Sequence, residues 1–280
     1  MDKKTILLTN DDGIEAEGLY RLYREIREDD QFKVVVIAPD KERSAVGHAI
    51  TVFSPIPVWE ETRDGKFFGY AVDGTPADCV KLAVKAILGK KPDLVISGIN
   101  KGANIGENVI YSGTVSAATE GTVYDIPSMA ISVDNLKESG LQVCCRICRK
   151  MAKMIISRGG LPGKYCLNIN LPDLPEKQIE GVRVTCRSTA KFNDFLIKKP
   201  IPGAEIITGW MAREFVQMCE NESDDYCAIQ ENGYISITPV HYDMTDYSRI
   251  DYFKNWGMRE TIMNYRKKEF VNDLKVGCQH

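Results

Sequence analysis

The stretch TILLTNDDG (residues 5–13) joins a short apolar run to two adjacent carboxylates, Asp11 and Asp12. An apolar run of this length that ends in turn-forming residues predicts a strand buried on both faces. Neighbouring carboxylates at the end of such a strand repel each other, and their desolvation is costly unless a cation neutralises them. Carboxylate oxygens suit Mg²⁺ or Mn²⁺ better than Zn²⁺. The pair alone is equally compatible with a solvated turn in which both aspartates cap the next helix.

The residues that follow predict a helix and a second strand. Leu19, Leu22, Tyr23 and Ile26 have the spacing of one helix face, and KVVVIA (residues 33–38) is a further apolar run. A strand, a helix and a strand in this order form a βαβ unit, which is almost always right-handed and has parallel strands.

The same alternation continues along the first half of the chain. Residues 49–60 and 66–72 predict a hairpin, or two antiparallel strands, projecting from the sheet. Further buried strands and helices alternate after it: helix 76–88, strand 93–97, helix 113–124, strand 128–133, helix 137–158 and strand 166–171. We therefore expect residues 1–172 to form an α/β core, a three-layer, Rossmann-like, doubly wound and mostly parallel sheet.

The pattern changes after residue 172. The pattern of residues 173–280 predicts a smaller C-terminal region with a β-hairpin, a strand at 233–239 and helices at 243–256 and 258–274. Its hairpin and helices are candidates for an oligomerisation interface. A proline-rich turn at 199–203 and an acidic loop at 220–225 separate its strands.

Composition excludes several classes of partner. The chain has 280 residues, a formal net charge of -3 and a pI near 5.8, which give no reason to expect a nucleic-acid polymer as partner. No stretch is long and apolar enough to span a bilayer, and no membrane partner is expected. Nine cysteines without a signal-peptide core favour reduced thiols and a cytoplasmic location. Cys145 and Cys148 form a CxxC inside a predicted helix, where packed thiols explain them better than zinc or redox chemistry.

Three polar loops follow predicted parallel strands, at residues 10–13, 40–48 and 98–114. Such loops meet at one edge of a parallel sheet, which is where ligands bind. They supply an all-oxygen ligand set with a charge of -2: Asp11, Asp12, Ser44 and Asn100. One divalent cation per subunit, Mg²⁺ or Mn²⁺, would cancel that charge and leave positions for water and a substrate oxygen.

The sequence YSGT (residues 111–114) opens a helix beside these loops. Free backbone N–H groups and the helix dipole favour an anion there, and a phosphate fits well. Ser112 is also a good N-cap residue, and the two roles are compatible.

Five segments in one order closely resemble the SurE family of survival proteins, which are metal-dependent 5′/3′-nucleotidases. They are NDDG (10–13), APDKERSAVGHAIT (38–51), DGTPADCV (73–80), PDLVISGINKGANIGENVIYSGTVSAATEG (92–121) and GYISITP (233–239). The resemblance is dense over residues 5–135 and recurs, more loosely, as far as residue 256.

The resemblance implies a site and an activity. Its metal ligands fall on Asp11, Asp12, Ser44 and Asn100, and its phosphate-contacting residues on Asn104, Ser112, Gly113 and Thr114. The implied reaction is hydrolysis of a nucleoside 5′-monophosphate, with the 3′-monophosphate as a further candidate, by metal-activated water. Asp11 and Asp12 are the catalytic candidates, and the sequence does not decide which of them orients the water or accepts its proton. The implied assembly is a homodimer or homotetramer.

Some residues have a second interpretation or depart from the family pattern. Lys101 and His48 are candidates for phosphate binding and for leaving-group protonation, but a solvated lysine and a structural histidine are the preferred interpretations. Glu17, IPGAEIITGWM (201–211) and SDDY (223–226) differ from the family, and of the last only Asp225 has a clear counterpart. These departures concern substrate preference and assembly.

Other functions fit the sequence less well. A phosphatase that uses Asp11 as nucleophile needs a second acid where this chain has Gly13. A receiver-like phospho-acceptor is far shorter, and a dinucleotide-binding module needs a GxGxxG after the first strand. The remaining alternative is a non-catalytic sensor that binds metal and nucleotide on the same fold.

Overall fold

The computed structural model describes residues 2–135, 138–189, 192–200, 207–215 and 221–263. By their internal contacts, residues Met1–Tyr242 form one compact unit and Asp243–His280 a second. The predicted C-terminal strand therefore belongs to the same compact unit as the core, while the predicted domain boundary at residue 172 stays a prediction. None of the described helices is long and apolar enough to cross a membrane.

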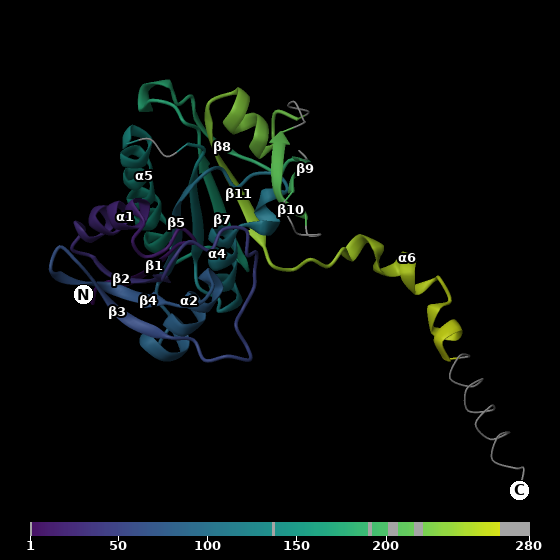
Figure 1. Cartoon of the computed structure of the whole chain (residues 1–280), viewed down its shortest axis with the longest axis horizontal. Coiled ribbons are helices and arrows are strands. Elements are labelled where there is room, and N and C mark those ends of the chain that lie inside the picture. Colours follow the sequence, from purple (N-terminus) through teal and green to yellow (C-terminus); the bar gives the residue numbers. More distant parts are fainter. Residues whose placement is uncertain (1, 136–137, 190–191, 201–206, 216–220, 264–280) are drawn as a thin grey trace, which may run out of the picture. The chain divides into compact units, whose positions relative to one another are not determined.

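Within the described residues, nine strands of the first unit form a single sheet (Figure 1). Their order across the sheet is β3-β4-β2-β1-β5-β6-β7-β11-β8. The strands are β1 Lys4–Thr9, β2 Phe32–Pro39, β3 Val58–Arg63, β4 Lys66–Val72, β5 Leu94–Lys101, β6 Ser128–Val133, β7 Tyr165–Leu171, β8 Gly181–Val184 and β11 Tyr234–His241. β1 pairs in parallel with both β2 and β5, which confirms the predicted βαβ unit. Among these nine strands, only the neighbouring pairs β3–β4 and β7–β11 are antiparallel, so the sheet is mostly parallel, as expected.

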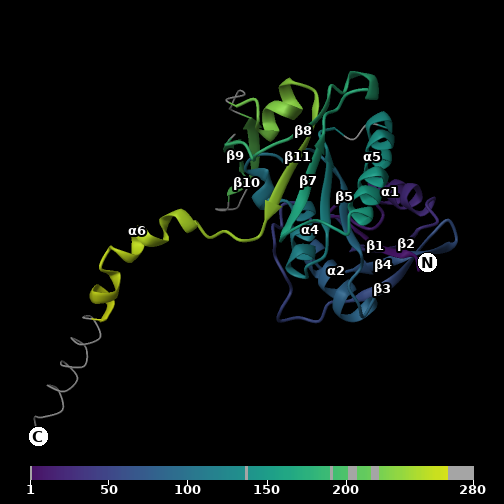
Figure 2. The same ribbon diagram turned by 180° about the vertical axis from the view of Figure 1, so that it is seen from behind.

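Helices cover both faces of the sheet and give the predicted three layers (Figures 1 and 2). The helices of the first unit are α1 Glu17–Arg27, α2 Pro76–Leu82, α3 Asn108–Tyr111, α4 Gly113–Val123 and α5 Glu138–Ser157. α1 and α5 pack on one face, and α2 and α4 pack on the other. A π-helical turn, Ala83–Ile87, continues α2 up to the predicted end at Gly89, whose φ is +63°.

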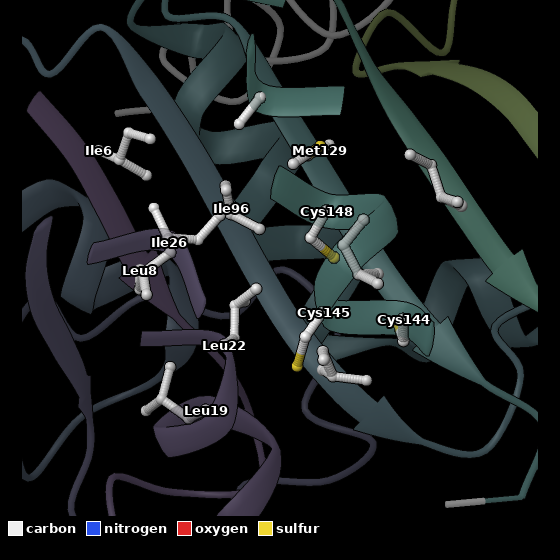
Figure 3. Close-up of a cluster of buried hydrophobic side chains, with 14 of the residues drawn as sticks. Ile6, Leu8, Leu19, Leu22, Ile26, Ile96, Met129, Cys144, Cys145 and Cys148 are labelled. Carbon is white, nitrogen blue, oxygen red and sulfur yellow. The ribbon is translucent and has the colours of Figure 1, made fainter. Parts of the chain in front are cut away.

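The apolar run of β1 is buried on both sides because its side chains alternate between the two layers. Ile6 and Leu8 join the cluster under α1 and α5 (Figure 3). Leu7 joins the cluster under α2 and α4. All three side chains are fully buried. A continuous apolar run rather than an alternating one is therefore the pattern that this position requires.

The cysteines of α5 belong to the core. Cys144, Cys145 and Cys148 are buried free thiols that face the strands and α1 (Figure 3). Burial raises the pKa of Cys145 and Cys148, which makes their thiols unreactive. The packing interpretation of the CxxC is confirmed. The expectation of reduced thiols is wrong at one position, because Cys227 is disulfide-bonded.

The predicted hairpin at 49–60 and 66–72 needs correction. β3 and β4 do pair antiparallel, but β4 also pairs in parallel with β2, so they extend the sheet at its edge and do not project from it. Residues 49–57 are not a strand, since Pro55 and Pro57 lack a ladder N–H and the N–H of Thr51 donates to the Asp78 carboxylate at 2.9 Å.

A separate two-stranded sheet consists of β9 Phe192–Pro200 and β10 Ile207–Phe215 in antiparallel register. It is the hairpin expected in the C-terminal region. The predicted turn at 199–203 lies partly outside the described residues.

The second unit contains the short helix α6 Ile250–Lys254. Residues 258–263 are also helical, and the remainder of the helix expected at 258–274 lies outside the described residues.

Candidate active site

Three loops converge on residues 11–13 at the carboxyl edge of β1, β2 and β5. The loop after β2 is attached to the loop after β1, because the N–H of Arg43 donates to the carbonyl of Asp11 at 2.7 Å. Gly13 has no room for a side chain, since a Cβ there would lie 2.9 Å from the carbonyl carbon of Lys41. The φ of Gly13 is +96°, a conformation that glycine adopts without strain. The predicted convergence of the loops is thus present.

Asp11 is buried between this loop and the start of α4. The Thr114 hydroxyl donates to Asp11 Oδ1, and a Cβ at Gly113 would lie 2.8 Å from the Cβ of Asp11. Burial raises the pKa of the Asp11 carboxyl, although the Thr114 hydrogen bond opposes the rise. The carboxylate and the phosphate-binding candidates Gly113 and Thr114 are therefore in direct contact.

Asp12 is half-buried and belongs to the same site. Burial, and then the charge of Asp11, raise the pKa of Asp12 to about 6. The backbone N–H of Lys101 donates to the Asp12 carboxylate and partly offsets that rise. The side chain of Lys101, the last residue of β5, is exposed, in agreement with its interpretation as a solvated lysine.

The other two predicted metal ligands lie on elements that contact this pair: Ser44 on the loop after β2, and Asn100 near the end of β5, which continues past the predicted strand end at residue 97. Ser44 is exposed, follows Arg43 and donates its hydroxyl to Glu42 Oε1 at 2.7 Å. Asn100 precedes Lys101 and donates its Nδ2 to the carbonyl of Gly102 at 2.8 Å, which leaves its Oδ1 as the ligand atom. Each residue is adjacent in the chain to one that contacts Asp11 or Asp12.

The donor set fits a hard divalent cation. Two adjacent carboxylates whose burial disfavours their charge need a positive partner, and the flanking donors are a hydroxyl and an amide oxygen. No group of three or more His, Cys, Asp and Glu side chains among the described residues could hold a metal. A metal site in this part of the chain therefore has to include neutral oxygen donors such as Ser44 and Asn100.

The start of α4 provides the predicted anion-binding segment. Ser112 is its N-cap, and the Ser112 hydroxyl accepts from the N–H of Val115 at 3.1 Å, so the capping role is confirmed. Ser112, Gly113 and Thr114 are all buried. The helix N-terminus lies against Asp11 through Thr114, so an anion bound there would be next to the carboxylate pair.

Asn104 lies deeper than the other phosphate-binding candidates. It is buried, and its Nδ2 donates to the hydroxyl of Ser132 at 2.8 Å. Its backbone is held by Asn168 and Asn170 of β7. Among the described residues, its hydrogen bonds go to these three and not to Asp11 or Asp12.

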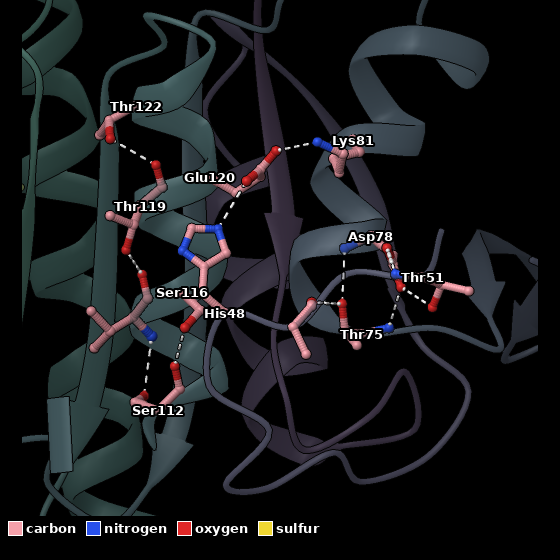
Figure 4. A network of polar contacts seen from close by, with 12 residues as sticks. His48, Thr51, Thr75, Asp78, Lys81, Ser112, Ser116, Thr119, Glu120 and Thr122 are labelled. Carbon is pink, nitrogen blue, oxygen red and sulfur yellow. Dashed lines mark hydrogen bonds and ion pairs between the residues drawn. The ribbon is translucent and has the colours of Figure 1, made fainter. Parts of the chain in front are cut away.

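His48 is held by a carboxylate that sequence reasoning did not single out. The Nε2 of His48 lies 2.8 Å from Oε2 of Glu120 in α4, and Lys81 of α2 donates to Oε1 of the same carboxylate at 3.0 Å (Figure 4). Glu120 was detectable only as a charge inside the otherwise small and apolar helix sequence VSAATEG. These contacts favour the structural interpretation of His48.

The model of the family described as Survival protein SurE matches residues 6–194, more than half of the 280-residue chain. The chain belongs to the SurE family. The resemblance first seen in its motifs is confirmed, and the family match includes every site residue discussed above.

Full-length relatives and a solved structure agree with this membership. The 5'-nucleotidase SurE of Syntrophobacter fumaroxidans is 43% identical to this SurE chain over 253 residues, covering 90% of the chain and 99% of the relative. The 5'-nucleotidase SurE of Syntrophus aciditrophicus is 45% identical over 263 residues, covering 92% and 95%. The crystal structure of the SurE protein from Aquifex aeolicus matches with a TM-score of 0.76 and 37% identity over 91% of this chain and 99% of that one. The predicted fold class is therefore confirmed.

Proposed function

We propose that this chain is a metal-dependent 5′-nucleotidase that hydrolyses nucleoside 5′-monophosphates, with 3′-monophosphates as a further substrate class, to nucleoside and phosphate. The contact of Asp11 with Thr114 and Gly113 carries the proposal, because it joins an anionic cation site to a helix N-terminus suited to phosphate. The names of the relatives, 5'-nucleotidase SurE, support the substrate class.

Each residue of the site has a defined task in this proposal. Asp11, Asp12, Ser44 and Asn100 would hold one Mg²⁺ or Mn²⁺ ion per subunit, which when bound supplies positive charge for the phosphoryl oxygens and acidifies a water molecule. The N–H groups of Gly113 and Thr114 and the hydroxyl of Ser112 would bind non-bridging phosphoryl oxygens, since the N–H of Ser112 already donates to the carbonyl of Asn108 at 3.0 Å. Asn104 would support them from the neighbouring loop.

Asp12 is the better candidate for orienting the attacking water. One oxygen of Asp11 already accepts the Thr114 hydroxyl and the residue is buried, whereas Asp12 is only half-buried. A carboxylate with one side open to solvent has room for a water molecule, and general-base groups act best when the proton acceptor lies within hydrogen-bond reach of that water.

The test is phosphate release from a panel of nucleoside 5′- and 3′-monophosphates by purified protein in Mg²⁺, Mn²⁺ or EDTA. Turnover should require metal, and Asp12→Asn should lower kcat/KM by at least about 100-fold, which corresponds to about 3 kcal/mol of transition-state stabilisation. Asp30→Asn makes the same change at an exposed aspartate just before β2, and this matched control should keep its activity.

A folded protein that releases no phosphate from any substrate with either metal would contradict the proposal. The non-catalytic sensor would then be tested by nucleotide-binding calorimetry. No feature of the site favours that alternative.

We further propose that the chain forms a homodimer or homotetramer in the cytoplasm. Exposed aromatic side chains in the second unit, among them Tyr252 and Trp256, support self-association. Free thiols at six described cysteines support a reducing compartment, with Cys227 as the exception.

A further inference from the structure

Two asparagines occupy the interior of β7, where side-chain amides are costly. Asn168 and Asn170 alternate with Leu167 and Ile169, so both point to the same face of the sheet, and both are fully buried. Asparagine is depleted in strands, and burying an amide without hydrogen bonds costs several times RT. An apolar residue would suit this position in a central strand better unless the amides bind something specific.

What they bind is the backbone of the loop that follows β5. Asn170 accepts from the N–H of Asn104 at 2.7 Å and donates to its carbonyl at 3.2 Å, as a neighbouring strand would. Asn168 donates to the same carbonyl at 2.8 Å. Both backbone polar groups of Asn104 are therefore satisfied by side chains of β7.

In Asn168 the amide nitrogen, and not the amide oxygen, is the atom that makes a hydrogen bond. Its Oδ1 is buried, and among the described residues it has no hydrogen-bond partner. An unpartnered buried oxygen is unfavourable. Among the described residues, the hydrogen bond to the carbonyl of Asn104 is therefore the one favourable polar contact that the Asn168 side chain makes.

The other end of the loop is held from the C-terminal part of the first unit. Asp225 is fully buried, and its carboxylate accepts from the N–H of Gly106 at 3.2 Å and from the N–H of Ser188 at 2.9 Å. The loop segment between Gly102 (φ +106°) and Gly106 (φ +54°) has glycine at both ends. Glycine-flanked segments lose more conformational entropy on ordering than others, so such contacts are needed to hold one conformation.

We propose that Asn168 and Asn170 are positioning residues that hold residues 102–106 in the conformation in which Asn104 serves the phosphate site. With its backbone fixed and one N–H of its amide donated to Ser132, Asn104 keeps its second amide N–H for the phosphoryl group. The inference rests on the proposed nucleotidase function and adds two residues that do not touch the substrate.

The test compares Asn170→Leu, Asn168→Leu and the control Thr238→Val. Thr238 is also buried and lies opposite Asn168 on β11. As far as the described residues show, its hydroxyl bonds only to the hydroxyls of Thr185, the residue after β8, and Ser236 of β11. Two readouts are used: kcat and KM with the best nucleotide of the panel, and amide hydrogen exchange of the peptide containing residues 103–107.

Asn170→Leu should lower kcat/KM by at least about tenfold and deprotect the loop peptide, while the melting temperature stays within a few degrees. Asn168→Leu, which removes one bond, should show the same changes to a smaller extent. Thr238→Val should leave both readouts at the wild-type level.

Wild-type kcat/KM and wild-type loop protection in Asn170→Leu would overturn the proposal. If Asn170→Leu does not fold, the milder Asn168→Leu decides by the same two readouts. If the wild-type protein shows no turnover, the nucleotidase proposal fails, and loop protection still tests whether the asparagines hold the loop.

Discussion

Gly113 is the residue at which the site has the least space. The carboxylate of Asp11 lies where a side chain of residue 113 would be, with its Oδ2 3.0 Å from a Cβ built there. Glycine in the first turn of a helix is otherwise unfavourable compared with alanine. The glycine is therefore explained by the close approach of Asp11 and not by helix formation.

Gly113→Ala should impair activity by moving the Asp11 carboxylate. We expect kcat/KM to fall by at least about tenfold, because small misplacements of reacting groups are costly, and unfolding free energy to fall by about 1–3 kcal/mol from overpacking. Steady-state kinetics and urea denaturation check these values.

The matched control for that variant is Gly140→Ala in α5, where a Cβ would meet Val133 Cγ1 at an ordinary 3.6 Å. It should retain full activity and equal or greater stability. Full activity of Gly113→Ala would show that Asp11 tolerates displacement, contrary to the site described here.

At the scale of elements, Glu120 links α4, α2 and the loop that carries Ser44. Its side chain is 5% exposed and bonds to His48 and Lys81. Burial opposes its ionisation, but these hydrogen bonds outweigh burial, so the pKa of the Glu120 carboxyl lies below its usual range.

Glu120→Gln should therefore destabilise the protein in a pH-dependent way. Because the folded-state pKa is below the unfolded-state value, the ionised carboxylate stabilises the fold above pH of about 4.3, and this contribution is lost as the pH falls through the folded-state pKa. We expect the unfolding free energy of Glu120→Gln to be about 1–3 kcal/mol below that of the wild-type protein at pH 7, and the difference between the two proteins to be smaller at pH 4. Urea denaturation of both proteins at the two pH values measures this difference in unfolding free energy. A difference that does not change with pH would contradict the prediction.

The sequence was most informative where one physical effect dominates. The buried strands β1, β2 and β6 were predictable because apolar runs of this length have few other uses. The start of α2 was predictable because Thr75 suits an N-cap and Pro76 the first helical position, and the structure adds a capping box between Thr75 and Asp78. The convergence of Asp11 with the start of α4 follows from parallel strand order, which the βαβ spacing indicates.

Long-range contacts were not predictable in the same way. Residues 49–57 have strand-like alternation, but the Asp78 carboxylate binds the N–H and hydroxyl of Thr51 instead of a neighbouring strand. The partners of Glu120 and of the β7 asparagines lie 39 or more residues away, and local periodicity contains no signal for them.

At the scale of the whole molecule, the second unit exposes unusually many large apolar side chains. Phe253 and Trp256 are 41% and 58% exposed, and no residue of α6 is buried. Exposed apolar groups gathered in one segment are typical of surfaces that bind another protein chain, and stable interfaces bury about 1,000 Å² or more in total.

We therefore expect the full chain to self-associate through this segment. Light scattering after gel filtration should give a multiple of the 31.4 kDa chain mass, and the double variant Phe253→Ser/Trp256→Ser should shift the protein toward the monomer. Val182→Ser, which replaces a 59% exposed apolar side chain on β8, is the control and should keep the wild-type mass. Because the carboxylate pair and the start of α4 lie within the first unit, a monomeric double variant that retains metal-dependent turnover would locate catalysis in one chain. A wild-type protein that elutes as a 31.4 kDa monomer at tens of micromolar would refute the proposed assembly.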